Sequence, residues 1–365
     1  LVLTTGGLGP TSDDMTREAA AELLGLPLRP DEEILAGIRQ RFARRGLPMA
    51  DRIARQAMVP AGTEVLPNPH GTAPGLYFPP PVLGGHRARH LFLLPGPPRE
   101  LRPMFVDHVL PKLRAALPPS SFRERRIYRL TGIGESQVEE RIGKQLEERG
   151  DLEVGYCARP SEVDFRLIGP PAILAETEPA IRAVVGDWIY SDGATLEAAL
   201  VGLLREKQLT VAVAESCTGG SLSARLTNVP GASEVFLAGY ITYGNEAKEK
   251  TLGVPASLLA VHGAVSEPVA VAMAEGARRV SGAQYALSTT GLAGPGGGTE
   301  AKPVGTVYVA LADGGHPTVV RRCYFPLDRV TFKHMTTSAA LDLLRRRILG
   351  RPLELGGGSS SPGLG

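Results

Sequence analysis

One segment of the chain combines a serine, a tyrosine and a lysine in a pattern that could support nucleophilic catalysis. The segment reads GASEVFLAGYITYGNEAK and contains Ser233, Tyr243 and Lys248. A serine hydroxyl becomes a nucleophile when a base takes its proton, and a lysine can be that base if burial or a nearby cation lowers its pKa. Tyr243 could relay the proton or hold the lysine amine. On spacing alone the pattern is weak, because a single lysine is usually a solvated surface residue.

A glycine-containing loop precedes this segment and could bind an anion. In TVAVAESCTGGSLSARL a β-branched strand stops at Glu215, and a helix restarts after Gly219 and Gly220. Backbone N–H groups at a helix start favour an anion, and glycine lets a phosphate approach the main chain closely. We therefore predict that Thr218, Gly219 and Gly220 bind substrate. A plain tight turn explains the two glycines equally well.

A second glycine-rich loop lies in STTGLAGPGGGTEAKPVGTVYVA, between two expected strands. Its backbone donors could hold an oxyanion or a ribose phosphate, and Lys302 adds one cation. We assign Gly294 and Gly296 to substrate binding, together with Asn245 of the NEAK sequence. The alternative interpretation is a flexible connection between two strands.

Cysteine chemistry is a weaker alternative. Cys217 lies at a predicted helix start, where a thiol pKa is lowered, but no histidine lies in the same loop to act as its base. We therefore rank Cys217 below Ser233 as a nucleophile. With Cys157 and Cys323 it makes three cysteines, none in a CxxC pair, so neither a disulfide framework nor a zinc site is expected.

Composition limits the classes of function. The 365 residues suggest two or three domains, and 43% hydrophobic residues are enough for globular cores. Forty basic residues nearly cancel 38 acidic ones, which gives no electrostatic argument for nucleic acid or an anionic membrane. No membrane-spanning run or signal peptide is visible. A reducing, cytoplasmic location is therefore expected.

The expected fold class is α/β, in three blocks followed by a tail. Residues 1–120 alternate strands with helices, at about 15–24 and 99–117, which predicts a mostly parallel sheet. The strand LVLTT reads as buried, and because the chain opens inside it at Leu1 we expect a fragment without its first elements. Residues 121–192 read as a small α+β module, in which GIGES is a helix entry. Residues 193–350 form the third block, and 351–365 a disordered tail.

The third block resembles the C-terminal domain of the CinA family, which also exists alone as the PncC-type nicotinamide mononucleotide deamidase. The resemblance rests on AESCTGG, GASEVFLAGYITYGNEAK, GAVSEPV and TGLAGPGGGTEAKPVGTVYVA. It implies hydrolysis of the nicotinamide carboxamide by a serine, without a cofactor, in pyridine nucleotide salvage. By motif the serine is Ser233, and Tyr243 and Lys248 follow it. The family's glycine-aspartate-arginine turn and second arginine are replaced here by Pro326–Arg329 and Lys333.

The first block resembles the N-terminal domain of CinA, which shares its fold with molybdopterin-binding MogA- and MoeA-type domains. The matching stretches are TTGGLGPTSDDMTREA, PNPHGTAPG and LPGPPRELRPMF. The resemblance implies metal-dependent hydrolysis of ADP-ribose. Gly6, Gly7 and Gly9 would hold the diphosphate, and Asp13 or Asp14 a divalent ion. Either aspartate could instead cap the following helix. Because opening elements are missing, we expect weak hydrolysis at most.

The second block matches the linker module called KH-like in CinA, and nothing in its residues indicates RNA binding. As partners we expect the nucleotide substrate and a second copy of the chain, with no direct contact to nucleic acid or membrane. Two other classes of function are considered, a pterin-binding scaffold without catalysis and a competence-related partner protein. Ammonia release from nicotinamide mononucleotide would separate the amidohydrolase from both.

Overall fold

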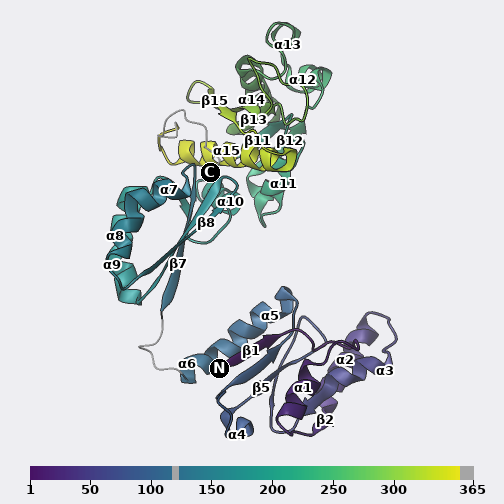
Figure 1. Ribbon diagram of the computed structural model, residues 1–365. Helices are drawn as coiled ribbons and strands as arrows, with labels where there is room; N and C mark the ends of the chain where they lie inside the picture. Colours follow the sequence, from purple (N-terminus) through teal and green to yellow (C-terminus); the bar gives the residue numbers. More distant parts are fainter. Residues whose placement is uncertain (117–122, 354–365) are drawn as a thin grey trace. The chain divides into compact units, whose positions relative to one another are not determined.

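The computed structural model describes residues 1–116 and 123–353 (Figure 1). Two compact units, Leu1–Phe122 and Arg123–Gly365, make up the chain. The predicted boundary at residue 120 and residues 354–365 of the predicted tail lie outside the described ranges. Within those ranges no helix is both long enough and apolar enough to cross a membrane.

The first unit contains a four-stranded sheet with the order β1-β6-β5-β4 and a separate β2–β3 pair. The strands are β1 (Val2–Thr5), β2 (Leu28–Pro30), β3 (Met58–Pro60), β4 (Glu64–Leu66), β5 (Gly75–Phe78) and β6 (Leu91–Leu94). The helices are α1 (Thr16–Leu23), α2 (Glu32–Arg44), α3 (Asp51–Ala54), η1 (Arg55–Ala57), α4 (Pro80–Leu83), α5 (Pro98–Met104), η2 (Phe105–Val109) and α6 (Leu110–Ala116).

Two predictions for this unit are wrong. Only β1 and β6 pair in parallel, whereas β6–β5 and β5–β4 are antiparallel. The reason is that β4 and β5 are joined by a Pro/Gly-rich turn too short for a crossover helix. The strand β1 is also not buried, since Leu1, Val2 and Leu3 are 57%, 42% and 40% exposed. It lies at the edge of the described sheet, with β6 as its one neighbour.

The middle domain (123–192) is an antiparallel sheet with the order β10-β7-β9-β8 and helices on one face. Its strands are β7 (Glu124–Thr131), β8 (Glu153–Arg159), β9 (Glu162–Gly169) and β10 (Ile189–Ser191). Its helices are α9 (Pro171–Val185) and the continuous run of α7 (Glu135–Val138), η4 (Glu139–Gly143) and α8 (Lys144–Glu147). The predicted helix entry at GIGES is confirmed, since Gly134 is the N-cap of α7.

The C-terminal domain (193–353) is built on a five-stranded sheet with the order β12-β11-β13-β14-β15. The strands are β11 (Val211–Glu215), β12 (Phe236–Ile241), β13 (Tyr285–Gly291), β14 (Thr306–Asp313) and β15 (Val319–Tyr324). The helices are α10 (Leu196–Glu206), α11 (Ser221–Thr227), η5 (Ala232–Glu234), α12 (Asn245–Leu252), α13 (Ala256–His262), α14 (Glu267–Ser281) and α15 (Arg329–Ile348).

Helices cover both faces of this sheet because the interior strand β11 is apolar on both sides. Val211 and Val213 of β11 pack with α10, α11 and α15, while Ala212 and Ala214 pack with α12, α13 and α14. In Figure 1 the long helix α15 runs beside this sheet. A continuous apolar strand of this kind is typical of a sheet buried on both faces.

The direction of three strands positions the candidate site. β12, β11 and β13 are neighbours and run parallel. The segments that follow them therefore leave the same edge of the sheet, the edge where open α/β sheets bind ligands. These segments are the loop after Glu215, the turn after Ile241 that leads into α12, and the glycine-rich loop after Gly291.

Candidate functional site

A buried lysine contacts a serine at this edge of the sheet. The Nζ atom of Lys248 lies 3.2 Å from Oγ of Ser216, the first residue after β11. Lys248 is fully buried and Ser216 is 9% exposed. Lys248 belongs to α12, which follows β12, and the parallel pairing of β11 with β12 brings the two residues together.

The surroundings of Lys248 suit a neutral amine. Its Nζ donates to the carbonyl oxygens of Thr242, at 2.9 Å, and Tyr243, at 3.1 Å. A neutral amine has two N–H donors and one lone pair, so the two carbonyls can take both donors and leave the lone pair for the hydroxyl of Ser216. No carboxylate pairs with Lys248 within the described residues, and burial lowers its pKa.

The predicted contact between Ser233 and Lys248 is wrong. Ser233 is exposed in η5, just before β12 begins, whereas Lys248 follows the end of β12. The six residues of β12 separate the two edges by roughly 20 Å, at about 3.3 Å per residue. Ser216 therefore occupies the position that the sequence analysis gave to Ser233.

Cys217 is not an activated thiol. It is 5% exposed and packs into the apolar core on the α15 side of the sheet. Burial raises the pKa of the Cys217 thiol to about 12, so the thiolate is scarce at neutral pH. The lower rank given to Cys217 is consistent with this environment.

One of the amides predicted to bind a phosphate, that of Gly220, already binds a carboxylate of the protein. Glu215 is fully buried, and its side chain accepts from the N–H groups of Gly220, Leu222 and Ser223 at 2.8–3.0 Å. It also accepts from the Ser223 hydroxyl at 2.7 Å. Thr218 is fully buried, with its hydroxyl 2.7 Å from that of Thr289. The helix start is thus an anion site that Glu215 already occupies. The Gly220 amide is therefore not free for a phosphate, and the Gly219 amide donates to the carbonyl of Ser216.

A cavity of about 180 Å³ opens beside Ser216. It is lined by Ser216, Cys217, Tyr243, Gly291, Leu292, Ala293, Gly294, Gly296 and Arg329. Gly294 and Gly296 thus lie in the same cavity as the serine, as their assignment to substrate binding requires. Asn245 is exposed at the start of α12 and Lys302 donates to the carbonyl of His262, and neither residue lines the cavity.

Tyr243 lies at the mouth of the cavity and does not hold the lysine with its ring. Its hydroxyl accepts from Nη2 of Arg329 at 2.9 Å, and its side chain is 61% exposed. Arg329 also donates from Nη1 to the carbonyl of Gly294 at 2.8 Å. The guanidinium thus joins the loop after β12 to the loop after β13. Only the backbone carbonyl of Tyr243 contacts Lys248.

The first turns of α15 bring two cations to this region. Arg329 is the first residue of α15 and lines the cavity. Lys333, one turn later, has its Nζ 3.8 Å from the position that a Cβ on Gly219 would occupy. Asp328 caps the helix by accepting from the N–H groups of Val330 and Thr331. The chain thus places positive charge near the glycine loop through side chains, while the amides of Gly219 and Gly220 are bonded within the protein.

Sequence reasoning missed Ser216, Glu215 and the position of Arg329. A signal for Ser216 was available, because it directly follows a buried strand, while Ser233 precedes one. Where parallel strands adjoin, residues after the strands meet at one edge and residues before them meet at the other. The capture of the helix amides by Glu215 had no comparable signal, since it depends on the side-chain conformation.

The first unit contains a separate cavity of about 400 Å³ around the predicted pyrophosphatase residues. Gly6, Gly7, Gly9 and Asp14 line it, but Asp13 is exposed and does not. Asp14 accepts from the N–H and hydroxyl of Thr11, and the hydroxyl bond lowers the pKa of this carboxyl most. Neither aspartate caps α1, whose N-cap is Met15 without a side-chain bond.

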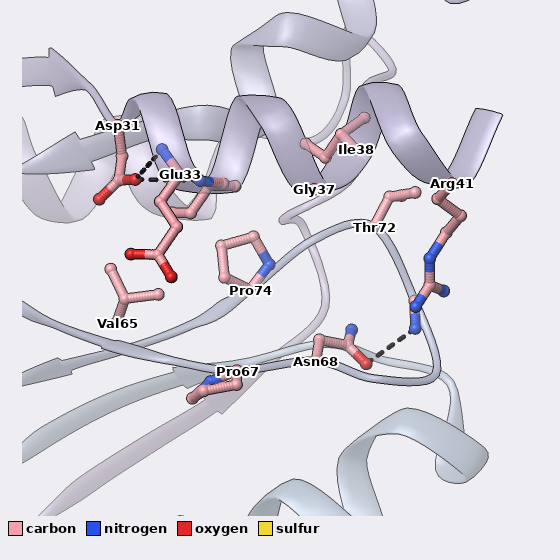
Figure 2. Close-up of a pocket in the computed structure, with 12 residues that line it drawn as sticks. Asp31, Glu33, Gly37, Ile38, Arg41, Val65, Pro67, Asn68, Thr72 and Pro74 are labelled. Atoms are coloured by element: carbon pink, nitrogen blue, oxygen red, sulfur yellow. Dashed lines mark hydrogen bonds between the residues drawn. The ribbon is translucent and has the colours of Figure 1, made fainter. Parts of the chain in front are cut away.

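A second carboxylate, not predicted, lines the same cavity. Glu100 is 9% exposed and accepts from Nδ2 of Asn68 at 2.9 Å. Figure 2 shows the adjoining hollow, of about 380 Å³, where Arg41 of α2 points toward the turn that carries Asn68. Arg41 donates there to the carbonyl of Pro69 and lines both cavities. Within residues 1–116 and 123–353, no three His, Cys, Asp or Glu side chains are grouped to hold a metal ion.

Three family models match the chain in succession. The probable molybdopterin binding domain matches residues 1–115, the KH domain of damage-inducible protein CinA matches residues 125–191, and the CinA C-terminal domain matches residues 193–348. The two compact units thus correspond to the first model and to the second and third models together.

Relatives extend this match along most of the chain. A CinA-like protein of Akkermansia muciniphila is 46% identical over 93% of this chain and 81% of its own length. A putative competence-damage inducible protein of Symbiobacterium thermophilum is also 46% identical, over 96% of this chain and 85% of its own length. A solved competence/damage inducible protein from Agrobacterium tumefaciens is 38% identical over 41% of this chain and 92% of its own, with a TM-score of 0.40. The chain therefore belongs to the CinA family.

Proposed function

We propose that the C-terminal domain is an amidohydrolase that converts nicotinamide mononucleotide to nicotinic acid mononucleotide and ammonia. The observation that carries the proposal is the buried Lys248 amine, which has no carboxylate partner among the described residues and lies 3.2 Å from the hydroxyl of Ser216, beside an open cavity. A serine with a neutral lysine as its base is suited to acyl transfer. The resemblance of this domain to the PncC-type deamidases gives the substrate.

The reaction runs through an acyl-enzyme. Oγ of Ser216 attacks the carboxamide carbon, and its proton passes to Nζ of Lys248. When the C–N bond breaks, Lys248 returns the proton to the leaving nitrogen, which departs as ammonia. A water molecule then gives a proton to Lys248 and its hydroxyl to the acyl carbon. Lys248 returns that proton to Oγ of Ser216 as the ester bond breaks, which regenerates the serine and the neutral amine. The backbone amides of the loop that contains Gly294 are suited to bind the oxyanion.

The size and charge of the site suit a mononucleotide. Pockets for drug-sized ligands measure about 300–1,000 Å³, so a cavity of about 180 Å³ holds only the ring and its carboxamide. The ribose phosphate would extend outward, where Arg329 and Lys333 supply positive charge. Phosphate recognition is thereby assigned to side chains of α15 in place of the amides at Thr218–Gly220.

An ammonia-release assay tests this function directly. The full chain should release ammonia from nicotinamide mononucleotide and much less from nicotinamide riboside or nicotinamide. Ser216→Ala should abolish turnover, while Ser233→Ala, the matched control, should retain activity close to that of the unsubstituted protein. The proposal fails if no ammonia appears, or if Ser216→Ala turns over normally. In the first case a scaffold role, pterin-binding or competence-related, would be favoured.

We propose a second activity for the first unit, the hydrolysis of a nucleoside diphosphate sugar of the ADP-ribose type. The supporting observation is that Asp14 and Glu100 line one cavity with the glycines after β1 and with Arg41, Arg45 and Arg99. Mg²⁺ is commonly bound by one or two carboxylates together with substrate phosphates. Asp14 and Glu100 fit such a metal ion, which would neutralise charge on the diphosphate, whereas Asp13 lies outside the cavity.

The family assignment also suggests how the whole chain is used. We propose that it works in the cytoplasm in pyridine nucleotide salvage, as a homodimer. The deamidase would need no cofactor, because serine and lysine supply the nucleophile and the base.

A further inference from the structure

A cavity outside both proposed active sites lies between the middle domain and the C-terminal domain. It measures about 420 Å³, within the range of pockets that bind small organic molecules. One wall is the turn between β7 and α7 together with the hairpin between β8 and β9, and the other is β15 and α15. The described residues that line it include none of those around Ser216.

The interior of the cavity is largely apolar. Ile133 and Val163 line it from the middle domain, and Phe325, Met335 and Ala339 line it from the C-terminal domain. Few polar groups converge on this surface. One of them is Ser161, whose backbone has a φ of 66° and whose hydroxyl has no hydrogen-bond partner within the described residues. An apolar interior with a few placed polar groups is the usual character of a ligand site.

Among the described residues, the carboxylates that line the cavity wall do not form an ion pair with the guanidinium of Arg321. Asp342 lines the wall but is neutralised by Arg345 and Arg346, which donate to its two oxygens at 2.7–3.0 Å. Arg159 and Glu162, on the hairpin, pair with each other at 3.4 Å.

Arg321, on β15, donates to the backbone carbonyl of Leu353 and has no carboxylate within salt-bridge distance in the described part of the chain. Burial lowers the pKa of Arg321, as expected when a charge lies in an apolar environment. Nη2 of Arg346, whose Nε donates to Asp342, is buried without a hydrogen-bond partner within residues 1–116 and 123–353. Glu135, the remaining acid of the lining, begins α7 and is exposed.

We propose that this cavity binds a small organic anion with a flat apolar body, whose acidic group pairs with Arg321. A guanidinium offers several donors in one plane and matches carboxylate, sulfonate and phosphate oxygens. The apolar residues of both domains would contact the body of the ligand, so that binding draws on both walls. The site is independent of the deamidase chemistry, because it shares no lining residue with the cavity beside Ser216.

A matched series of probes tests the charge preference. We would titrate the full chain by calorimetry with 2-naphthoate, 2-naphthamide and 2-naphthylmethylammonium, which share one ring system and differ in charge. The naphthoate should bind at submillimolar concentration, the amide about tenfold more weakly, and the ammonium weaker still. Equal affinity for the three, or no binding of the naphthoate at millimolar concentration, would overturn the proposal.

Substitutions then locate the bound anion. Arg321→Gln should weaken naphthoate binding at least about tenfold. Arg322→Gln, the neighbouring exposed arginine that donates to the carbonyl of Ala301, should leave it unchanged. If Arg329→Gln weakens binding and Arg321→Gln does not, the naphthoate occupies the cavity beside Ser216 and the proposal is wrong.

Filling the cavity with Ala339→Trp should also abolish binding. If that variant does not fold, intermolecular NOEs in the unsubstituted protein serve instead. Naphthoate protons should contact the methyl groups of Met335 and Ala339, and contacts only to residues elsewhere would refute the site.

Discussion

Two glycine-containing loops, each of which connects a strand to a helix, differ in the role of their glycines. After β1, Gly6, Gly7 and Gly9 lead toward α1 and line an open cavity that Asp14 also lines. After β11, Gly219 and Gly220 lead into α11, but Glu215 accepts from the amides at the helix start. The first loop is available to an external anion, whereas the second holds an internal one. A glycine-rich turn before a helix therefore does not by itself indicate a phosphate site.

The internal carboxylate has a consequence for catalysis. Ser216 directly follows Glu215, so the bonds that fix the Glu215 side chain at the helix start also restrain the backbone of Ser216. The loop after β11 thus serves to position a hydroxyl. The glycines of the loop after β1 line an open cavity, so that loop is suited to binding.

The largest effect is expected from Lys248→Met, which removes the base from the positioned loop. Turnover of nicotinamide mononucleotide should fall by about three or more orders of magnitude, because the serine then has no proton acceptor. In the unsubstituted protein kcat/KM should fall as pH decreases through the lowered pKa of Lys248, since only the neutral amine accepts a proton. A rate that is unchanged down to acidic pH would exclude Lys248 as the base. Ammonia release measured across pH provides both results.

The next effect tests whether the Glu215 carboxylate occupies the anion site at the start of α11. Glu215→Ala should destabilise the C-terminal domain by about 3–5 kcal/mol, because several buried N–H donors lose a charged acceptor. Sulfate or phosphate should restore part of the lost stability by occupying the vacated helix start. Urea unfolding with and without sulfate measures this, and chloride at matched ionic strength is the control. A loss that sulfate and chloride restore equally would contradict the filled anion site.

The elements could be predicted from the sequence more fully than the site. Buried apolar runs such as 211–215 and the amphipathic segment 196–206 specify a strand and a helix through local periodicity. The lysine was identified because its motif is distinctive, and the cavity position of Gly294 followed from the end of a strand. Ser233 was chosen because its motif resembles that of the CinA family and lies in the same segment as Lys248, although proximity in space depends on strand direction. The role of Glu215 was not predicted, and the residue was interpreted only as the end of a strand. A pattern of residue types does not reveal which backbone amides a side chain will contact.

A smaller effect should separate phosphate recognition from the glycine loop. Lys333→Gln and Arg329→Gln should each raise KM for nicotinamide mononucleotide about tenfold, because the amides of Gly219 and Gly220 are already bonded and cannot replace the lost cation. KM for nicotinamide riboside should change little. Arg322→Gln, an exposed arginine outside the cavity lining, is the matched control. Equal increases in KM for riboside and nucleotide would assign Arg329 and Lys333 a structural role.

The smallest effect is expected for ligand binding in the first unit. It tests whether the loop after β1 is free to bind an external anion. Asp14 lines the cavity with the glycines, whereas the adjacent Asp13 is exposed and does not. Asp14→Asn should therefore weaken binding of ADP-ribose in the presence of Mg²⁺ several-fold, because one carboxylate ligand is lost. Asp13→Asn removes the same charge one residue earlier and should have no effect. Calorimetric titration of ADP-ribose with and without Mg²⁺ compares the pair even if hydrolysis is slow. If both substitutions weaken binding equally, the net charge of the loop is responsible and Asp14 is not a specific ligand.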